Sequence, residues 1–153
     1  MQDLVSRLAE DSVKLRPPAS AQQLVEFEET LGSALERSYR DFLSVSDGLD
    51  GFYVDMVILG CRDWPDSPEL KVAQSFLDMV LDVEMLEDED LPSSTKLVPV
   101  AVNSDATHGI FMIDTQGAVA ERYWWTGNGS SMLFRDLNEV FAYVIDPREY
   151  LSR

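Results

Sequence analysis

The sequence predicts an α+β fold with N-terminal helices, a central antiparallel sheet, and a middle and a C-terminal helix that flank the sheet. Two observations predict this class and its organisation as one domain. Three of the strand-like runs follow one another directly instead of alternating with helices, which is typical of an antiparallel sheet. The 153 residues contain neither a repeat nor a linker-like segment. We therefore expect a single domain over residues 1–153.

Two helices are predicted before residue 33. Apolar residues recur at helical spacing within residues 1–15, and Pro17 breaks any continuation. Ser20 and Gln23 have the spacing of a capping box at the start of the next helix. Gly32 is placed to end that helix, because glycine adopts the left-handed conformation of a helix C-cap at little cost.

The middle of the chain reads as helix, strand and helix. Residues 35–43 repeat the helical pattern, and Asp47-Gly48 is suited to a tight turn. Aromatic and β-branched residues predict one strand over 52–59, with a bend near its middle and Gly60 at its end. An apolar stripe then predicts a helix over 68–84.

The C-terminal part carries the predicted sheet. Strands are expected at 97–102, 109–114 and 118–125, joined as an antiparallel meander. Asn128-Gly129 has the composition of a further turn. A final helix over residues 137–146 is closed by a proline.

The charge balance excludes several classes of protein. Twelve Lys and Arg against 28 Asp and Glu give a net charge of -16, a field that repels nucleic-acid backbones. The longest stretch without a charge, residues 123–134, is shorter than the ~20 residues of a membrane-spanning helix. A single cysteine and no apolar leader lead us to expect a cytoplasmic protein that binds neither nucleic acid nor membrane.

Few residues are suited to catalysis, because the chain has one histidine and one cysteine. His108, beside Asp105, is interpreted as a solvated turn histidine. Cys61 precedes Arg62, which could lower a thiol pKa, but a structural thiol is the favoured interpretation. Residues 47–51 lack the ligand spacing of a calcium loop. We therefore predict no enzyme, cofactor or metal site; a hydrolase with paired carboxylates is the remaining alternative, without supporting spacing.

An acidic run is the first candidate for binding a partner. It comprises Glu87, Asp88, Glu89 and Asp90. A solvated loop is its ordinary interpretation, and a weak divalent-ion site is a poorer one. The functional interpretation is a docking surface that attracts a basic partner by electrostatic steering.

Tryptophans supply the second group of candidates. Trp124 and Trp125 are adjacent on a predicted strand, so their side chains should point to opposite faces, one in the core and one less buried. An outward Trp125 would suit a binding hot spot, although cover of the sheet edge is as good an interpretation. Trp64, beside Asp63 in a predicted loop, either packs under that loop or contacts a partner. We expect Trp64, Trp125 and Asp63 to anchor the bound partner.

The spacing of residues 17–48 resembles the N-terminal signature of the SUKH superfamily, bacterial immunity proteins grouped with a fungal cell-wall-synthesis regulator. The matching positions are Leu24, Phe27-Glu28, Leu31-Gly32, Leu35, Tyr39, Phe42-Leu43 and Asp47-Gly48. Glu36 departs from the pattern, where proline is usual. Residues 97–101, 109–114 and 134–141 resemble the later strands and closing helix more loosely.

This resemblance implies a SUKH-like α+β domain without catalytic activity. Bacterial members neutralise polymorphic toxins, often nucleases, in contact-dependent competition. The expected function is therefore stoichiometric binding of a basic toxin domain by a monomer or weak dimer, in which acidic residues steer and aromatic residues anchor. The alternative is a non-catalytic regulator or scaffold that binds an endogenous cellular partner, as the fungal member implies.

Overall fold

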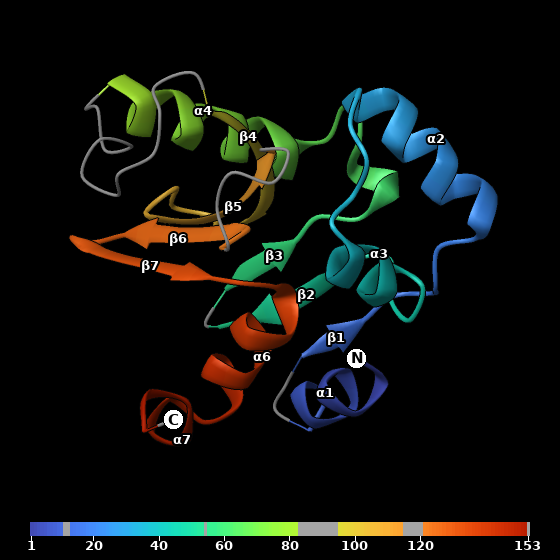
Figure 1. The fold of residues 1–153 in the computed structure, drawn as a ribbon. Coiled ribbons are helices and arrows are strands. Elements are labelled where there is room, and N and C mark those ends of the chain that lie inside the picture. The colour runs from blue at the N-terminus through green and yellow to red at the C-terminus, as the bar shows by residue number, and fades with distance from the viewer. Residues whose placement is uncertain (11–12, 54, 83–94, 115–120, 153) are drawn as a thin grey trace.

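The computed structural model describes residues 1–10, 13–53, 55–82, 95–114 and 121–152. In these residues, seven strands form one antiparallel sheet whose spatial order is the order along the chain (Figure 1). The strands are β1 (Lys14–Leu15), β2 (Leu49–Phe52), β3 (Met56–Ile58), β4 (Lys96–Val102), β5 (His108–Asp114), β6 (Tyr123–Gly127) and β7 (Ser130–Phe134). The predicted α+β class and the antiparallel meander are confirmed.

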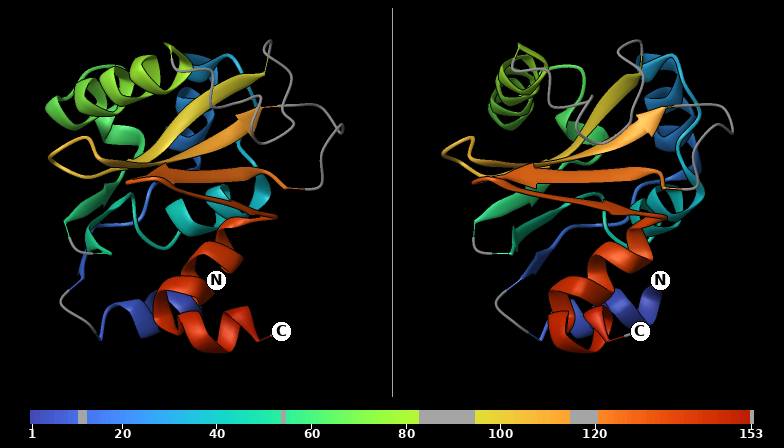
Figure 2. Two further views of the ribbon diagram at one scale, coloured as in Figure 1. Left: turned by 90° about the vertical axis from the view of Figure 1, so that its left-hand side faces the viewer. Right: turned by 60° about the vertical axis from the view of Figure 1, so that its left-hand side comes forward.

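Helices cover both faces of this sheet (Figures 1 and 2). They are α1 (Gln2–Leu8), α2 (Ala21–Leu31), α3 (Arg37–Leu43), α4 (Pro68–Asp82), α6 (Leu137–Ile145) and α7 (Pro147–Leu151), with a short 3-10 helix η1 (Cys61–Asp63). α4 packs on one face around Phe76 and Phe111. α1, α2, α3 and α6 contribute to the core of the other face.

Strand β6 contributes side chains to the hydrophobic cores on both faces of the sheet. Tyr123 and Trp125 point into the core shared with α3 and α6, whereas Trp124 points into the core under α4. The opposite directions predicted for the two tryptophans are therefore confirmed. One of them is less buried, as expected, but the difference is small, because Trp124 is 0% and Trp125 only 7% exposed. Because helices cover both faces of the sheet, neither face of the interior strand β6 is open to solvent.

The predicted helix signals correspond to real caps. The Ser20 hydroxyl accepts a hydrogen bond from the Gln23 backbone, and the Gln23 side chain accepts one from the Ser20 N–H, which completes the capping box. Gly32 ends α2 with a φ of 71°. Glu36, which departs from the proline of the family pattern, is the N-cap of α3 and accepts a hydrogen bond from the Ser38 N–H. A carboxylate therefore starts this helix.

The strand predicted over residues 52–59 is only partly confirmed, because Met56–Ile58 form β3 whereas Phe52 ends the separate strand β2. Residues 49–58 form the β2–β3 hairpin, in which Tyr53 has a positive φ of 43°. β1 and β7 were not predicted as strands, since β1 has only two residues and β7 begins with two serines. The first residues of the strand predicted over 118–125, and the last two of the helix predicted over 68–84, lie outside the described residues.

The remaining boundaries follow local chemistry. Asn128 and Gly129 both have positive φ, which is the type I′ geometry that suits a two-residue hairpin. α6 ends at Ile145, and Pro147 then begins α7 at a position where its missing N–H costs nothing.

Substitution of Ser20 by Ala should lower the free energy of unfolding by about 1 kcal/mol, because the Gln23 N–H loses its acceptor. Urea unfolding followed by tryptophan fluorescence measures the change. Ser20→Asp keeps an acceptor and should retain most of the stability. Equal losses in the two variants would show that the lost hydrogen-bond acceptor does not account for the change in stability.

Candidate functional site

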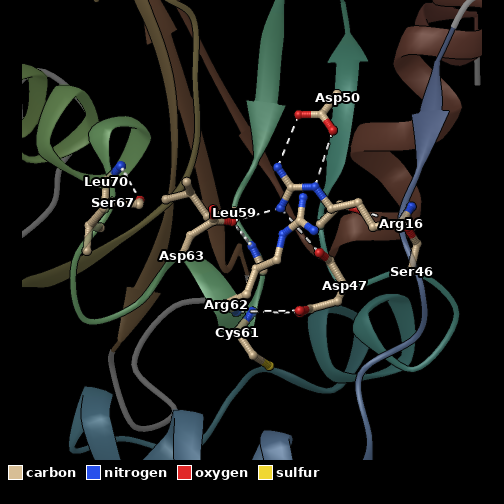
Figure 3. A network of polar contacts seen from close by, with 12 residues as sticks. Arg16, Ser46, Asp47, Asp50, Leu59, Cys61, Arg62, Asp63, Ser67 and Leu70 are labelled. Atoms are coloured by element: carbon tan, nitrogen blue, oxygen red, sulfur yellow. Dashed lines mark hydrogen bonds and ion pairs between the residues drawn. The ribbon is translucent and has the colours of Figure 1, made fainter.

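A buried arginine organises the segment that contains two of the predicted site residues (Figure 3). The Arg16 Nη1 donates to Asp63 Oδ2 at 2.9 Å and to the Asp47 carbonyl at 3.3 Å. Its Nη2 and Nε donate to the two carboxylate oxygens of Asp50 at 3.1 and 3.3 Å. We call Arg16, Asp47, Asp50 and Asp63 the Arg16 network. Burial alone would lower the pKa of Arg16, but the hydrogen bonds and the negative charges of Asp50 and Asp63 together outweigh burial and raise it.

The same network fixes the chain after β3. Asp47 accepts a hydrogen bond from the Cys61 N–H at 2.6 Å, and Asp63 accepts one from the Gly60 N–H at 2.7 Å. A Cβ on Gly60 would lie 2.2 Å from the Asp47 carbonyl oxygen, so only glycine allows this approach. Residues 60–64 are therefore held against the turn before β2.

Asp63 and Trp64 occupy different environments. The Asp63 side chain is buried and engaged by Arg16, so the structure gives it an internal electrostatic role. Trp64 is half-buried and packs against Phe27 of α2, with ring centroids 5.8 Å apart. It lines a hollow of about 250 Å³ between α2 and residues 61–65. Its indole Nε1 is buried and has no hydrogen-bond partner among the described residues.

The Cys61 thiol lines the same hollow but is not activated. Burial, and then the charge of Asp47, raises its pKa to about 12. The adjacent Arg62 does not offset these effects. At neutral pH the thiol is therefore protonated, as the interpretation of Cys61 as a structural thiol requires.

A second candidate region lies where three strand connections meet at one end of the sheet (Figure 2). The His108 ring contacts that of Tyr53 at a centroid distance of 6.3 Å, and its Nε2 is 3.0 Å from the Asn128 Nδ2. His108 begins β5 and is half-buried, so its interpretation as a solvated turn histidine is wrong. Contacts with the neighbouring connections, invisible in the local sequence, account for this burial.

Next to His108 is a hollow that we call the aromatic pocket. Its walls include Tyr53, Trp125 and Tyr143, and its volume is about 50 Å³. The rings of Tyr53 and Tyr143 stand nearly perpendicular to that of Trp125, at 89° and 86°. Trp125 thus belongs to a pocket wall instead of projecting from the surface. Sequence analysis does not identify Tyr53, which lies in the strand predicted over residues 52–59, or Tyr143 as site residues. The only feature of the sequence that could indicate a pocket at these positions is their aromatic character.

The acidic run Glu87, Asp88, Glu89 and Asp90 lies outside the described residues. Within residues 1–10, 13–53, 55–82, 95–114 and 121–152, no three His, Cys, Asp or Glu side chains are grouped to hold a metal ion. The helices in these ranges include none of the length and apolarity needed to cross a membrane.

The fold and these two regions define an α+β protein with a helix-covered antiparallel meander. The sequence model of the SMI1 / KNR4 family (SUKH-1) matches residues 18–146. The chain belongs to this family, so the resemblance found in the sequence is confirmed. Membership is consistent with an immunity or a regulatory protein, and the family is generally non-catalytic. No curated protein matches the chain.

Replacement of Arg16 by Met should lower the free energy of unfolding by about 3 kcal/mol, because Asp63 would remain buried without its cation. Urea unfolding at neutral pH measures the loss. Lys71→Met is the matched control, because the Lys71–Asp66 pair is exposed and should contribute less than about 1 kcal/mol. Similar losses in both variants would contradict a structural role for the Arg16 network.

Alkylation of Cys61 by iodoacetamide at pH 8 should be at least about a hundredfold slower in the folded protein than in urea, because the raised pKa depletes the thiolate. Intact mass reports the adduct directly, since the chain has one cysteine. Cys61→Ser should give no adduct in either condition. Folded and unfolded rates within tenfold of each other would contradict the raised pKa.

Proposed function

We propose that this protein is an immunity protein that neutralises a polymorphic toxin domain by stoichiometric binding. The observation that carries the proposal is the net charge of -16 on a chain of the SMI1 / KNR4 family (SUKH-1). The partner that fits this charge is a basic protein, and a nuclease toxin is basic where it binds phosphates. The protein acts in the cytoplasm as a monomer or weak dimer.

The proposed mechanism requires no catalytic group. Acidic side chains of the immunity protein occupy the Lys and Arg side chains with which the toxin binds its substrate. The long-range field accelerates encounter, and contacts made after encounter determine how long the complex lasts. The protonated Cys61 thiol agrees with a function that depends on binding alone.

The second candidate is regulation of an endogenous partner, which the SMI1 / KNR4 membership also supports. The two candidates differ in the partner. A toxin encoded beside this chain supports immunity, whereas an endogenous protein supports regulation.

The first test is co-expression of the tagged chain with the product of the adjacent upstream gene. We expect a one-to-one complex whose affinity falls as salt rises, because surface electrostatics are screened. Light scattering gives the stoichiometry, and calorimetry at low and high salt gives the affinity. Failure to form a complex would contradict the immunity function.

Reversal of the charges at Glu87, Asp88, Glu89 and Asp90 should slow association with this toxin and flatten its salt dependence. Stopped-flow fluorescence measures the association rate. A control variant carries Lys at four other exposed acidic positions: Asp3, Glu10, Glu29 and Asp41. An equal reduction in both variants would show that net charge, and not the acidic run, steers the partner.

A further inference from the structure

The three connections at one end of the sheet combine backbone strain with exposed side chains. Among the described residues, the non-glycine residues with positive φ are Tyr53, Ala106 and Asn128, at 43°, 53° and 49°. They lie in the β2–β3, β4–β5 and β6–β7 connections respectively. A positive φ costs energy, most of all for a bulky side chain such as that of Tyr53, and such residues are concentrated at functional sites. Tyr53 nevertheless presents an aromatic ring that is 40% exposed.

The aromatic pocket beneath this ring is suited to a small cation. Tyr53 lies 4.9 Å and Tyr143 5.8 Å from Trp125 between ring centroids, and both rings are nearly perpendicular to the indole. Aromatic faces attract cations, and the Tyr53 ring, 40% exposed, is the more accessible one beside the buried Trp125. The volume of about 50 Å³ admits a charged head group but not a ligand of drug size.

The charge of the neighbouring connections favours the same occupant. Residues 52–58, 102–109 and 125–132, which include the three connections, contain Asp55 and Asp105 but neither Lys nor Arg. Both carboxylates are on exposed residues. Asp55 also lines a neighbouring hollow of about 230 Å³, together with Glu69 and apolar residues of β3, β4 and α4. This end of the sheet therefore offers carboxylates beside apolar walls.

We propose that this end of the sheet docks a basic protein and that the aromatic pocket receives one arginine side chain of that partner. The inference rests on the proposed function for the existence of the partner, and adds the place and chemistry of the contact. A guanidinium is planar and weakly hydrated, so it stacks on aromatic rings more readily than a lysine ammonium does. The carboxylates of Asp55 and Asp105 attract the same charge.

The probe is Nα-acetyl-arginine methylamide, titrated into the ¹⁵N-labelled full chain. We expect saturable shifts of the Trp125 indole N–H and of the His108 backbone amide. The matched probe is the citrulline analogue, which has nearly the same shape without the charge. It should bind about tenfold more weakly, since only the charged group gains from the aromatic faces. Equal binding of both probes, or shifts spread over acidic residues elsewhere, would overturn the proposal.

Variants of Tyr53 locate the contact. Tyr53→Asn removes the ring and tolerates the positive φ, and should weaken binding of the arginine probe about tenfold. Tyr53→Phe keeps the ring and should bind as the parent does. Unchanged indole signals of Trp64 and Trp124 in both variants verify the fold. Unchanged probe binding by Tyr53→Asn would overturn the role of the pocket.

The toxin complex separates this inference from the proposed function. Tyr53→Asn should weaken the complex about tenfold, and Tyr53→Phe should not. A complex that is insensitive to Tyr53→Asn would overturn the docking site and leave the immunity function standing. Selective binding of the arginine probe without any toxin complex would support the pocket and contradict the immunity function.

Discussion

Burial of one cation constrains the path of the chain where three of its segments meet. Arg16 is 8% exposed and requires carboxylates to offset the lost hydration, and Asp63, 47 residues away in sequence, supplies one of them. Asp50 supplies another from β2. The segment before α2, the first hairpin and η1 must therefore meet at one point. Because residues 60–64 are fixed there, Trp64 is placed against α2.

The sheet restricts where a partner can bind. Helices cover both faces, so even adjacent tryptophans on β6 are buried on opposite sides. Strand connections and helix surfaces remain available to a partner, and connections carry function more often because they tolerate changes in sequence. At one end of the meander, three connections lie together, and the strained residue of one of them, Tyr53, lines an aromatic pocket.

Charge and aromatic contacts act over different distances. The net charge of -16 acts over roughly a Debye length, about 8 Å in physiological salt, and it does not specify one orientation of the partner. Rings at fixed angles act only on contact and therefore select a geometry. In a complex with a basic protein, the acidic surface would determine how often the partners meet and the pocket how they fit. Such a division would separate the rate of encounter from the fit of the complex.

The sequence by itself determined the α+β class, the family, the caps of α2, the β4–β6 meander and the opposite directions of Trp124 and Trp125. These features depend on residues close together in sequence, where spacing and propensity act directly. Only the tertiary structure decided that residues 49–58 form a hairpin, that Trp125 is a pocket wall, and that Asp63 holds Arg16. Each depends on contacts between segments that are distant in sequence. A local sequence pattern does not identify the distant side chain that packs against a residue or pairs with its charge.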